Sequence, residues 1–442
     1  MAQQSDEIQE LIAQLALLGS ASRQREQQHE LTSTPIFTKS VLEHAAPTKK
    51  TSFSQYGLLA GDADLLGDIA GQDRDLSKLP LDQDPRVYFN ISAPSSAFIC
   101  GSQGSGKSHT LSCLLENCLL RSDAERINKL NSPLAGLVFH YDPFISDLKG
   151  TPCEAAHLSS NTNISVRVLC SPSNVQTMKR TYSPLKNVTV EALMINESHL
   201  NTKRMLDLMA VSQEERMPLY LHEITRILRE MRVVQQIIGG SFKYATFKKE
   251  VEKSPMTDAQ KAPLTQRLDT LESFMPKFQT APGVKKKGAG RYDWSIKYMN
   301  AGSEASTLTN TLLSSIRLQR HLGTRVFIST QEPSISPRLL DLCSITIVHR
   351  FTSPDWLSCL RVHLAALKND QGVKAIFSQI IRLRVGEALL FAPSAIIGVQ
   401  SEAREAGDVR VELVKLGTDH MRVKIRNRVT NDGGKSVMAI GS

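Results

Sequence analysis

The residues with the most specific chemistry in this chain form a glycine-rich loop. Gly101 to Ser108 read G-S-Q-G-S-G-K-S, a complete match to the phosphate-loop pattern G-x-x-x-x-G-K-[S/T]. Glycines at the first, fourth and sixth positions allow the turn and let backbone N–H groups approach phosphate oxygens. Lys107 would reach the β- and γ-phosphates, and the Ser108 hydroxyl would bind Mg²⁺. The loop therefore predicts a nucleoside triphosphate with its metal, Mg-ATP, as the cofactor.

The flanking segments support this interpretation over a chance glycine-rich turn. Residues 95–100 are a short apolar run typical of a buried strand, and residues 108–119 have the apolar spacing of a helix. The start of a helix presents unpaired N–H groups and a partial positive charge to an anion. The predicted nucleotide-binding residues are Gly101, Ser102, Gln103, Gly104, Ser105, Gly106, Lys107, Ser108 and His109, with Ser108 also predicted to bind the metal.

Polar groups for catalysis are less clearly marked. Gln331 follows a predicted strand at 324–329, and ligands of open α/β sheets bind at the carboxyl ends of strands. The alternative is that its amide caps the next turn, because Pro333 is close. An arginine that stabilises transferred-phosphoryl charge has four candidates, and the pattern does not choose among them: Arg317, Arg320, Arg325 and Arg350.

Alternation of strand-like and helix-like segments predicts an α/β fold with a parallel sheet flanked by helices. The expected organisation is a flexible N-terminal arm with a short amphipathic helix, two halves of a core, a helical insertion and a C-terminal strand with a basic tail. Further strands are expected at 86–91, 137–143, 165–170, 188–195, 345–350, 386–391 and 395–399. The expected boundaries are 1–80 for the arm, 81–198 for the phosphate-loop half, 199–300 for the insertion and a basic loop, 301–400 for the second half and 401–442 for the tail.

Composition places the chain among soluble globular proteins. Of its 442 residues 41% are hydrophobic and 22% are charged, with no secretory start and no run long enough for a membrane helix. Seven scattered cysteines without a C-x-x-C pair argue against disulfides and zinc, and favour an intracellular location, cytoplasmic or nuclear. The net charge of +9 permits a nucleic-acid partner. The basic–apolar alternation at 420–428 equally fits an edge strand with one charged face.

The run from Gln319 to Leu340, which contains Thr330-Gln331-Glu332-Pro333, resembles the HerA/FtsK branch of phosphate-loop ATPases. Segments ending Asp142-Pro143 and beginning Gly386-Glu387 are similar to further strands of that family. The resemblance covers roughly residues 86–435 and implies a RecA-like parallel sheet. It also implies Gln331 as γ-phosphate sensor, assembly as a homo-hexamer, and double-stranded DNA as the moved substrate. Its fungal members have no assigned role.

Hydrolysis requires a carboxylate pair that the chain does not show where the family carries it. That position, an apolar strand ending in Asp-Glu, falls at 285–296, which reads K-K-K-G-A-G-R-Y-D-W-S-I. Glu197, after an apolar run, is a possible base, although Asn196 and Ser198 fit a helix cap there. Asp142 and Asp293 are weaker substitutes. We interpret the stretch from about 275 to 297 as the site of a lost segment.

Two functions therefore compete. The first is an ATPase that assembles into a ring and moves DNA, with turnover that DNA stimulates. The second is a nucleotide-binding switch or scaffold that does not hydrolyse ATP. A nucleotide kinase or GTPase is disfavoured because the chain has no N-K-x-D guanine signature.

Overall fold

The computed structural model describes most of the chain, and its residues divide into two compact units. Unit 1 comprises Met1–His140, Cys153–Ile164 and Leu313–Ser442, and unit 2 comprises Tyr141–Pro152 and Ser165–Leu312. The described ranges are 2–17, 23–45, 53–70, 79–122, 127–141, 146–148, 150–209, 219–280, 305–332, 335–364, 370–403 and 409–433.

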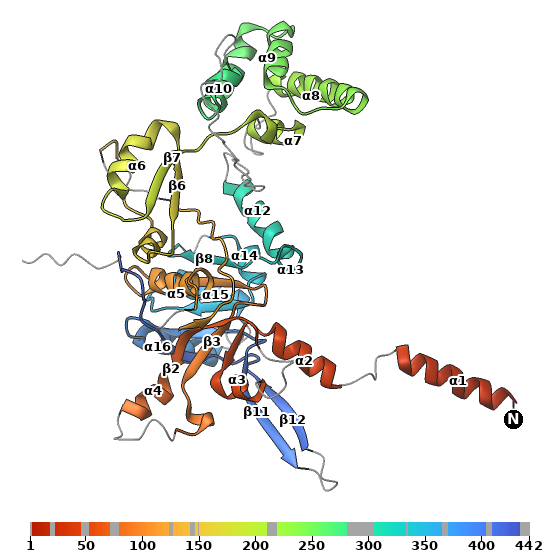
Figure 1. Ribbon diagram of the computed structural model, residues 1–442, viewed down its shortest axis with the longest axis vertical. Helices are drawn as coiled ribbons and strands as arrows, with labels where there is room; N and C mark the ends of the chain where they lie inside the picture. The colour runs from red at the N-terminus through yellow and green to blue at the C-terminus, as the bar shows by residue number, and fades with distance from the viewer. Residues whose placement is uncertain are drawn as a thin grey trace, which may run out of the picture. The chain divides into compact units, whose positions relative to one another are not determined.

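Within its described ranges, unit 1 is built on a sheet of 11 strands in the order β12-β11-β1-β3-β2-β13-β10-β9-β4-β8, with β5 paired to β2. Figure 1 labels β2, β3, β8, β11 and β12 of this sheet. The strands are β1 (Ile36–Thr38), β2 (Tyr56–Asp62), β3 (Arg86–Asn90), β4 (Ser96–Cys100), β5 (Asn128–Lys129), β8 (Val326–Thr330), β9 (Ile345–Val348), β10 (Glu387–Phe391), β11 (Ile396–Ala403), β12 (Val409–Lys415) and β13 (Met421–Ile425).

The predicted RecA-like parallel sheet is wrong, because this sheet is mixed and mostly antiparallel. The parallel pairs of the described sheet are β4–β8, β4–β9 and β1–β11. The other neighbours, such as β10–β9, β10–β13 and β13–β2, run antiparallel. The sequence pattern identified β4, β8 and β9 as strands, but the partners and directions of the remaining strands depend on long-range pairing that local periodicity does not encode.

The sheet also includes segments that the sequence pattern assigned elsewhere. β1 and β2 come from the stretch predicted as a flexible arm, and they pair with β3 on its two sides. β13 comes from the basic–apolar segment and lies between β2 and β10, so it is an interior strand and not an edge strand. Residues 137–141, predicted as a strand, form none, and their large apolar side chains are exposed.

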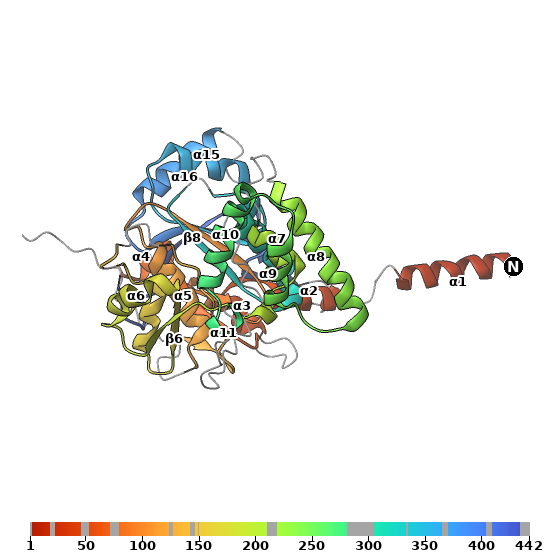
Figure 2. The ribbon, with the colours of Figure 1, turned by 90° about the horizontal axis from the view of Figure 1, so that it is seen from above.

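Helices cover both faces of the sheet around β4. Ala97 and Ile99 pack into a core with Leu114 of α5 (Lys107–Leu119). The alternate residues, Phe98 and Cys100, pack against α15 (Pro354–His363) and α16 (Asp370–Arg382), as expected for a strand whose side chains alternate between faces. Figure 2 shows α5 on one side of β8 and α15 and α16 on the other.

The remaining described helices of unit 1 are short or peripheral to this core. They are α1 (Ala2–Leu17), α2 (Arg23–Ser33), α3 (Lys39–Ala45), α4 (Ala63–Ala70), α13 (Gln319–Leu322) and α14 (Pro337–Asp341), with 3₁₀ turns η2 (Leu81–Gln83) and η3 (Glu154–Ser160).

Unit 2 combines a small sheet with a group of helices. β6 (Val166–Cys170) and β7 (Val188–Ala192), both predicted as strands, form a separate two-stranded parallel sheet. The stretch predicted as a helical insertion, 199–300, contains helices that share a buried core among its described residues. The described helices of unit 2 are α6 (Val175–Tyr182), α7 (Thr202–Met209), α8 (Leu219–Ile238), α9 (Tyr244–Lys253), α10 (Asp258–Ser273) and α11 (Lys277–Thr280), with 3₁₀ turns η4 (Pro172–Asn174) and η5 (Glu197–His199). α12 (Ala305–Arg317) includes residues of both units.

A buried carboxylate on α5 joins that helix to the C-terminal segment. The Glu116 side chain is 0% exposed, and the Arg426 Nη1 donates to its Oε2 at 2.7 Å. The backbone N–H of Thr430 donates to Glu116 Oε1 at 2.9 Å, and the Thr430 hydroxyl donates at 2.5 Å. Arg426 also donates to Leu58 O of β2 at 2.8 Å. This network ties the helix that follows the phosphate loop to two other parts of unit 1.

We expect Glu116→Ala to lower the free energy of unfolding by about 3–5 kcal/mol, because it leaves the buried Arg426 guanidinium without its counter-charge. Asp64→Ala is the control in the same unit, since the side chains of Asp64 and its partner Arg422 are 72% and 43% exposed. That change should cost less than about 1 kcal/mol. Urea unfolding at pH 7 measures both, and equal losses for the two variants would contradict the role assigned to Glu116.

Candidate functional site

The phosphate loop lies between β4 and α5, as the sequence predicts, and its glycines adopt backbone angles that favour glycine. Gly101, Gly104 and Gly106 have φ of 148°, 71° and 111°. A Cβ on Gly101 would lie 2.7 Å from His349 Cβ, so the loop leaves β4 against the end of β9. A Cβ on Gly104 would meet nothing within 4 Å, so this part of the loop is open to a ligand. Lack of space and backbone angle thus both favour glycine at position 101, whereas only the backbone angle favours it at position 104.

Ser102 anchors the loop through its backbone. Its N–H and its hydroxyl both donate to Arg350 O at 2.9 Å. These bonds attach the loop to the segment that follows β9. Its carbonyl accepts from Ser105 Oγ and from Lys107 Nζ, each at 2.7 Å. The turn is therefore closed by hydrogen bonds within the loop and held in place by β9.

These residues fit a bound triphosphate. Burial lowers the pKa of Lys107, and its ammonium is already directed at the loop, where phosphate oxygens could replace Ser102 O as its acceptors. Gly106 is the N-cap of α5 and supplies no side-chain cap, so the helix start is available to an anion. Ser108 is exposed in the first turn of α5, where a metal-binding hydroxyl has to be. Gln103 is exposed at the loop tip.

The side chain of His109, a predicted nucleotide-binding residue, contacts the C-terminal segment. Its Nε2 lies 2.8 Å from Arg426 O, so the ring is held by the C-terminal segment. Arg426 is the same residue that pairs with Glu116. The ring is thus engaged within unit 1, and the nucleotide contact of His109 stays a prediction.

Gln331 is brought to the loop. Cys100 and Thr330 are paired in the parallel register of β4 and β8, so Gly101 and Gln331 leave the sheet side by side. Gln331 is exposed, and its carbonyl accepts from Trp356 Nε1 at 3.2 Å. This placement agrees with a contact to the terminal phosphate, which stays a prediction.

The structure separates the four candidate arginines. Arg350, two residues after the end of β9, lies at the loop end of the sheet and is exposed. Arg325 lies at the other end of the sheet, before β8, where its guanidinium donates to Ser92 O at 2.8 Å and Gly323 O at 2.6 Å. Arg317 and Arg320 also precede β8 and are exposed. Of the four candidates, Arg350 is therefore the one at the phosphate-loop end of the sheet.

Glu197 has a structural environment in unit 2. Asn196 caps η5, with its side chain accepting from Ser198 N at 3.0 Å, as the helix-cap alternative predicted. The Glu197 carboxylate accepts from Tyr244 N at 3.3 Å, at the start of α9. The phosphate loop belongs to unit 1. These contacts show Glu197 holding helices of unit 2, and its role as a catalytic base stays a prediction.

The other acidic candidates, Asp142 and Asp293, lie outside the described residues, as does most of the stretch interpreted as a lost segment. Among the residues that the structure describes, no group of three or more His, Cys, Asp or Glu side chains is placed to hold a metal ion. No described helix has the length and apolar character needed to cross a membrane.

Sequence reasoning missed His349 and Thr110, which meet beneath the loop. His349 is 0% exposed, and its Nε2 lies 2.8 Å from Thr110 Oγ1. Burial lowers the pKa of His349 to about 4, and the charges of Lys107 and His109 act in the same direction. The signal in the sequence was a histidine directly after a four-residue apolar strand, which by itself does not show what the ring contacts.

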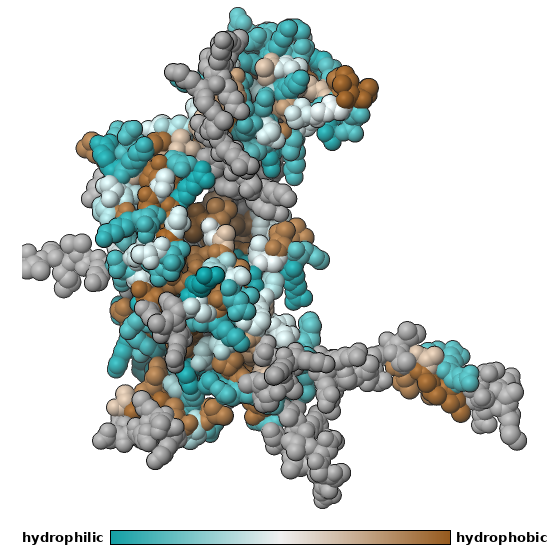
Figure 3. All heavy atoms as spheres, viewed as in Figure 1, coloured by the Kyte–Doolittle hydropathy of each residue, from teal (hydrophilic) through white to brown (hydrophobic). Residues whose placement is uncertain are grey.

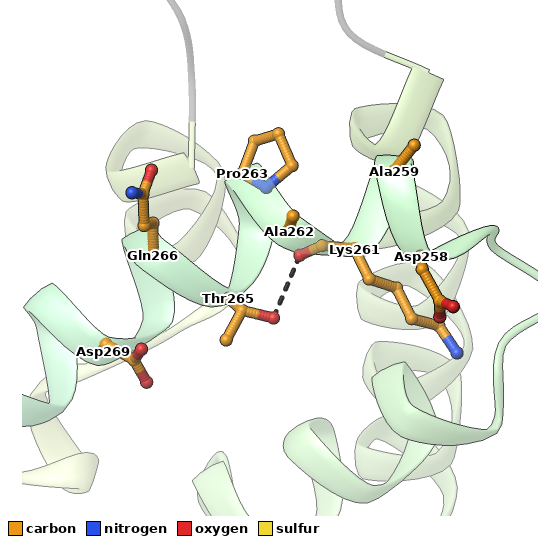
Figure 4. A pocket seen from close by; sticks show the side chains of 8 residues that line it. All are labelled: Asp258, Ala259, Lys261, Ala262, Pro263, Thr265, Gln266 and Asp269. Atoms are coloured by element: carbon orange, nitrogen blue, oxygen red, sulfur yellow. Dashed lines mark hydrogen bonds between the residues drawn. The ribbon is translucent and has the colours of Figure 1, made fainter.

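Other surface features do not add to this site. A groove of unit 2 is lined by side chains of α10 alone, around Pro263, where Thr265 Oγ1 donates to Lys261 O at 3.0 Å (Figure 4). Its residues include no nucleophile paired with a base. Exposed apolar side chains gather on α1 and at the end of α8 (Figure 3): Ile8, Leu11, Ile12 and Leu15, and Val233, Val234, Ile237 and Ile238.

Comparison with models of known protein families gives no match, and comparison with proteins of curated function gives none either.

We expect Gly101→Ala to destabilise the protein by about 2 kcal/mol or more, because the new methyl group would overlap His349 and Ser105 and the backbone angle is unfavourable. Gly104→Ala is the control, at a φ of 71° and with free space around the new methyl group. It should cost about 1 kcal/mol from backbone strain alone. Chemical denaturation of both variants tests this, and a Gly104→Ala loss as large as that of Gly101→Ala would contradict the packing described.

Stability should also depend on pH through His349. Above pH 6.5 the ring is neutral in the folded and in the unfolded chain. As the pH falls towards 4, the His349 ring becomes protonated in the unfolded chain first, because its pKa is lower in the folded chain. The folded state should therefore lose about 3 kcal/mol between pH 6.5 and 4 from this group. Urea unfolding across this range should show a steeper decline for the wild type than for His349→Asn. Parallel curves would mean that His349 titrates normally in the folded protein.

Proposed function

We propose that this chain binds Mg-ATP at the loop from Gly101 to Ser108. The observation that carries the proposal is the loop geometry: left-handed glycines between a parallel strand and a helix start, with a lysine ammonium held over the turn. This arrangement supplies backbone N–H groups, a helix dipole and a cation for the phosphates.

The residues have distinct roles in this proposal. Lys107 exchanges Ser102 O for oxygens of the β- and γ-phosphates, and Ser108 binds Mg²⁺, which neutralises phosphate charge when bound. Gln331, beside the loop, contacts the terminal phosphate. Arg350, which lies just beyond the end of β9, approaches the phosphates from that side of β4.

A second candidate function, a nucleotide-binding switch that does not hydrolyse ATP, has its own support. The sequence lacks an Asp-Glu strand, and the Glu197 carboxylate accepts a hydrogen bond from Tyr244 N in unit 2. A carboxylate is normally needed to activate the attacking water. The similarity to HerA/FtsK-type motors favours turnover and a DNA substrate; it rests on motifs alone.

Binding is tested by titrating the purified chain with ATP and Mg²⁺ and following thermal unfolding. ATP should raise the unfolding temperature, because a ligand that binds the folded state stabilises it. Lys107→Ala should remove this shift. Lys253→Ala is the control, since that exposed lysine lies on α9 of unit 2. A shift that survives Lys107→Ala would show that ATP binds elsewhere.

Turnover then separates the two functions. Phosphate release that requires Lys107 and increases with double-stranded DNA would support the motor. Binding without phosphate release, with or without DNA, would support the switch.

A further inference from the structure

His349 is held on every side by elements that shape the phosphate loop. It directly follows β9, and its backbone N–H donates to Cys100 O at 2.8 Å, one residue before the loop begins. Its ring Nδ1 lies 2.9 Å from Glu387 O, at the start of β10. Its Nε2 lies 2.8 Å from the hydroxyl of Thr110, on the first turn of α5. One buried residue, through its backbone and its ring, thus connects three strands with the helix of the loop.

The partners determine which nitrogen carries the proton. A backbone carbonyl can only accept, so the contact with Glu387 O requires a hydrogen on Nδ1. In the neutral ring Nε2 then has a lone pair and accepts from the Thr110 hydroxyl. The same hydroxyl lies 3.2 Å from Gly106 O, farther than the 2.8 Å that separates it from Nε2. The neutral imidazole therefore orients Thr110, one turn into α5.

The ring also packs against both ends of the loop. A Cβ on Gly101 would lie 2.7 Å from His349 Cβ, and a Cβ on Gly106 would lie 3.4 Å from its Cε1. These two glycines are where the loop leaves β4 and where it enters α5. Arg350, the next residue, accepts two hydrogen bonds from Ser102. Residues 349 and 350 consequently contact Gly101 and Ser102 at the start of the loop and Gly106 near its end.

We propose that His349 is a positioning residue for the nucleotide, which holds the phosphate loop in its binding shape through Thr110 and the two glycines. This inference rests on the proposed ATP binding. It assigns a function to a side chain that would not itself touch the phosphates, and it predicts that loop shape is set by β9 before the ligand arrives. Because the loop is prepared in advance, less of the binding free energy is used to order it.

The experiment measures the dissociation constant of a fluorescent ATP analogue with Mg²⁺ for four variants of the full chain. His349→Asn keeps a donor for Glu387 O but has no acceptor that reaches Thr110. Thr110→Val removes the hydroxyl and leaves the ring in place. Each should weaken binding about tenfold, the value of one lost hydrogen bond of about 1.4 kcal/mol. The double variant should show the same tenfold loss, because both changes remove one interaction.

His349→Gln serves as the rescue variant, since its Oε1 can accept from Thr110 as Nε2 does; its affinity should stay within about threefold of the wild type. A positioning role is overturned if Thr110→Val binds as the wild type does, or if the two single losses multiply to about a hundredfold in the double variant. Thr110→Val decides the matter even where His349→Asn does not fold. Failure of the wild type to bind, or binding unchanged in Lys107→Ala, would instead overturn the proposed function.

Discussion

The structure of unit 1 depends on the compensation of one buried charge. Glu116 lies on α5 without exposure to solvent, and such a carboxylate is tolerated only when it is paired and hydrogen-bonded. Arg426 and Thr430 supply these partners from the end of the chain, and Arg426 also binds Leu58 O of β2. These contacts link α5, whose start would face the phosphates, to a C-terminal segment more than 300 residues away in the sequence.

A second constraint acts from the opposite side of the loop. The Ser102 N–H and hydroxyl attach the loop to Arg350 O, beyond β9, and the neutral ring of His349 holds Thr110 of α5. Burial opposes protonation of this ring, so the acceptor for Thr110 persists at neutral pH. The same arrangement leaves no space for a side chain at position 101, where the backbone angle also favours glycine, whereas position 104 needs glycine for backbone angle alone.

The basic residues of the C-terminal segment have partners in their own chain. Arg422 pairs with Asp64, Lys424 donates to Val385 O at 2.7 Å, and Arg426 pairs with Glu116. The alternation of basic and apolar residues at 420–428 therefore reflects an interior strand with polar contacts on one face. Positive charge in a sequence is a weak argument for nucleic acid unless the structure leaves that charge unpaired.

The sequence by itself determined the elements whose causes are local. The loop at 101–108, the strands that became β4, β8 and β9, and the helical nature of 199–278 follow from glycine positions, apolar runs and 3.6-residue spacing. Only the tertiary structure decided that β1, β2 and β13 join one mixed sheet, that the ring of His109 turns to Arg426, and that His349 meets Thr110. Strand partners and buried polar contacts join residues far apart in the chain, and their free energy depends on distances and burial that no local pattern of residue types contains.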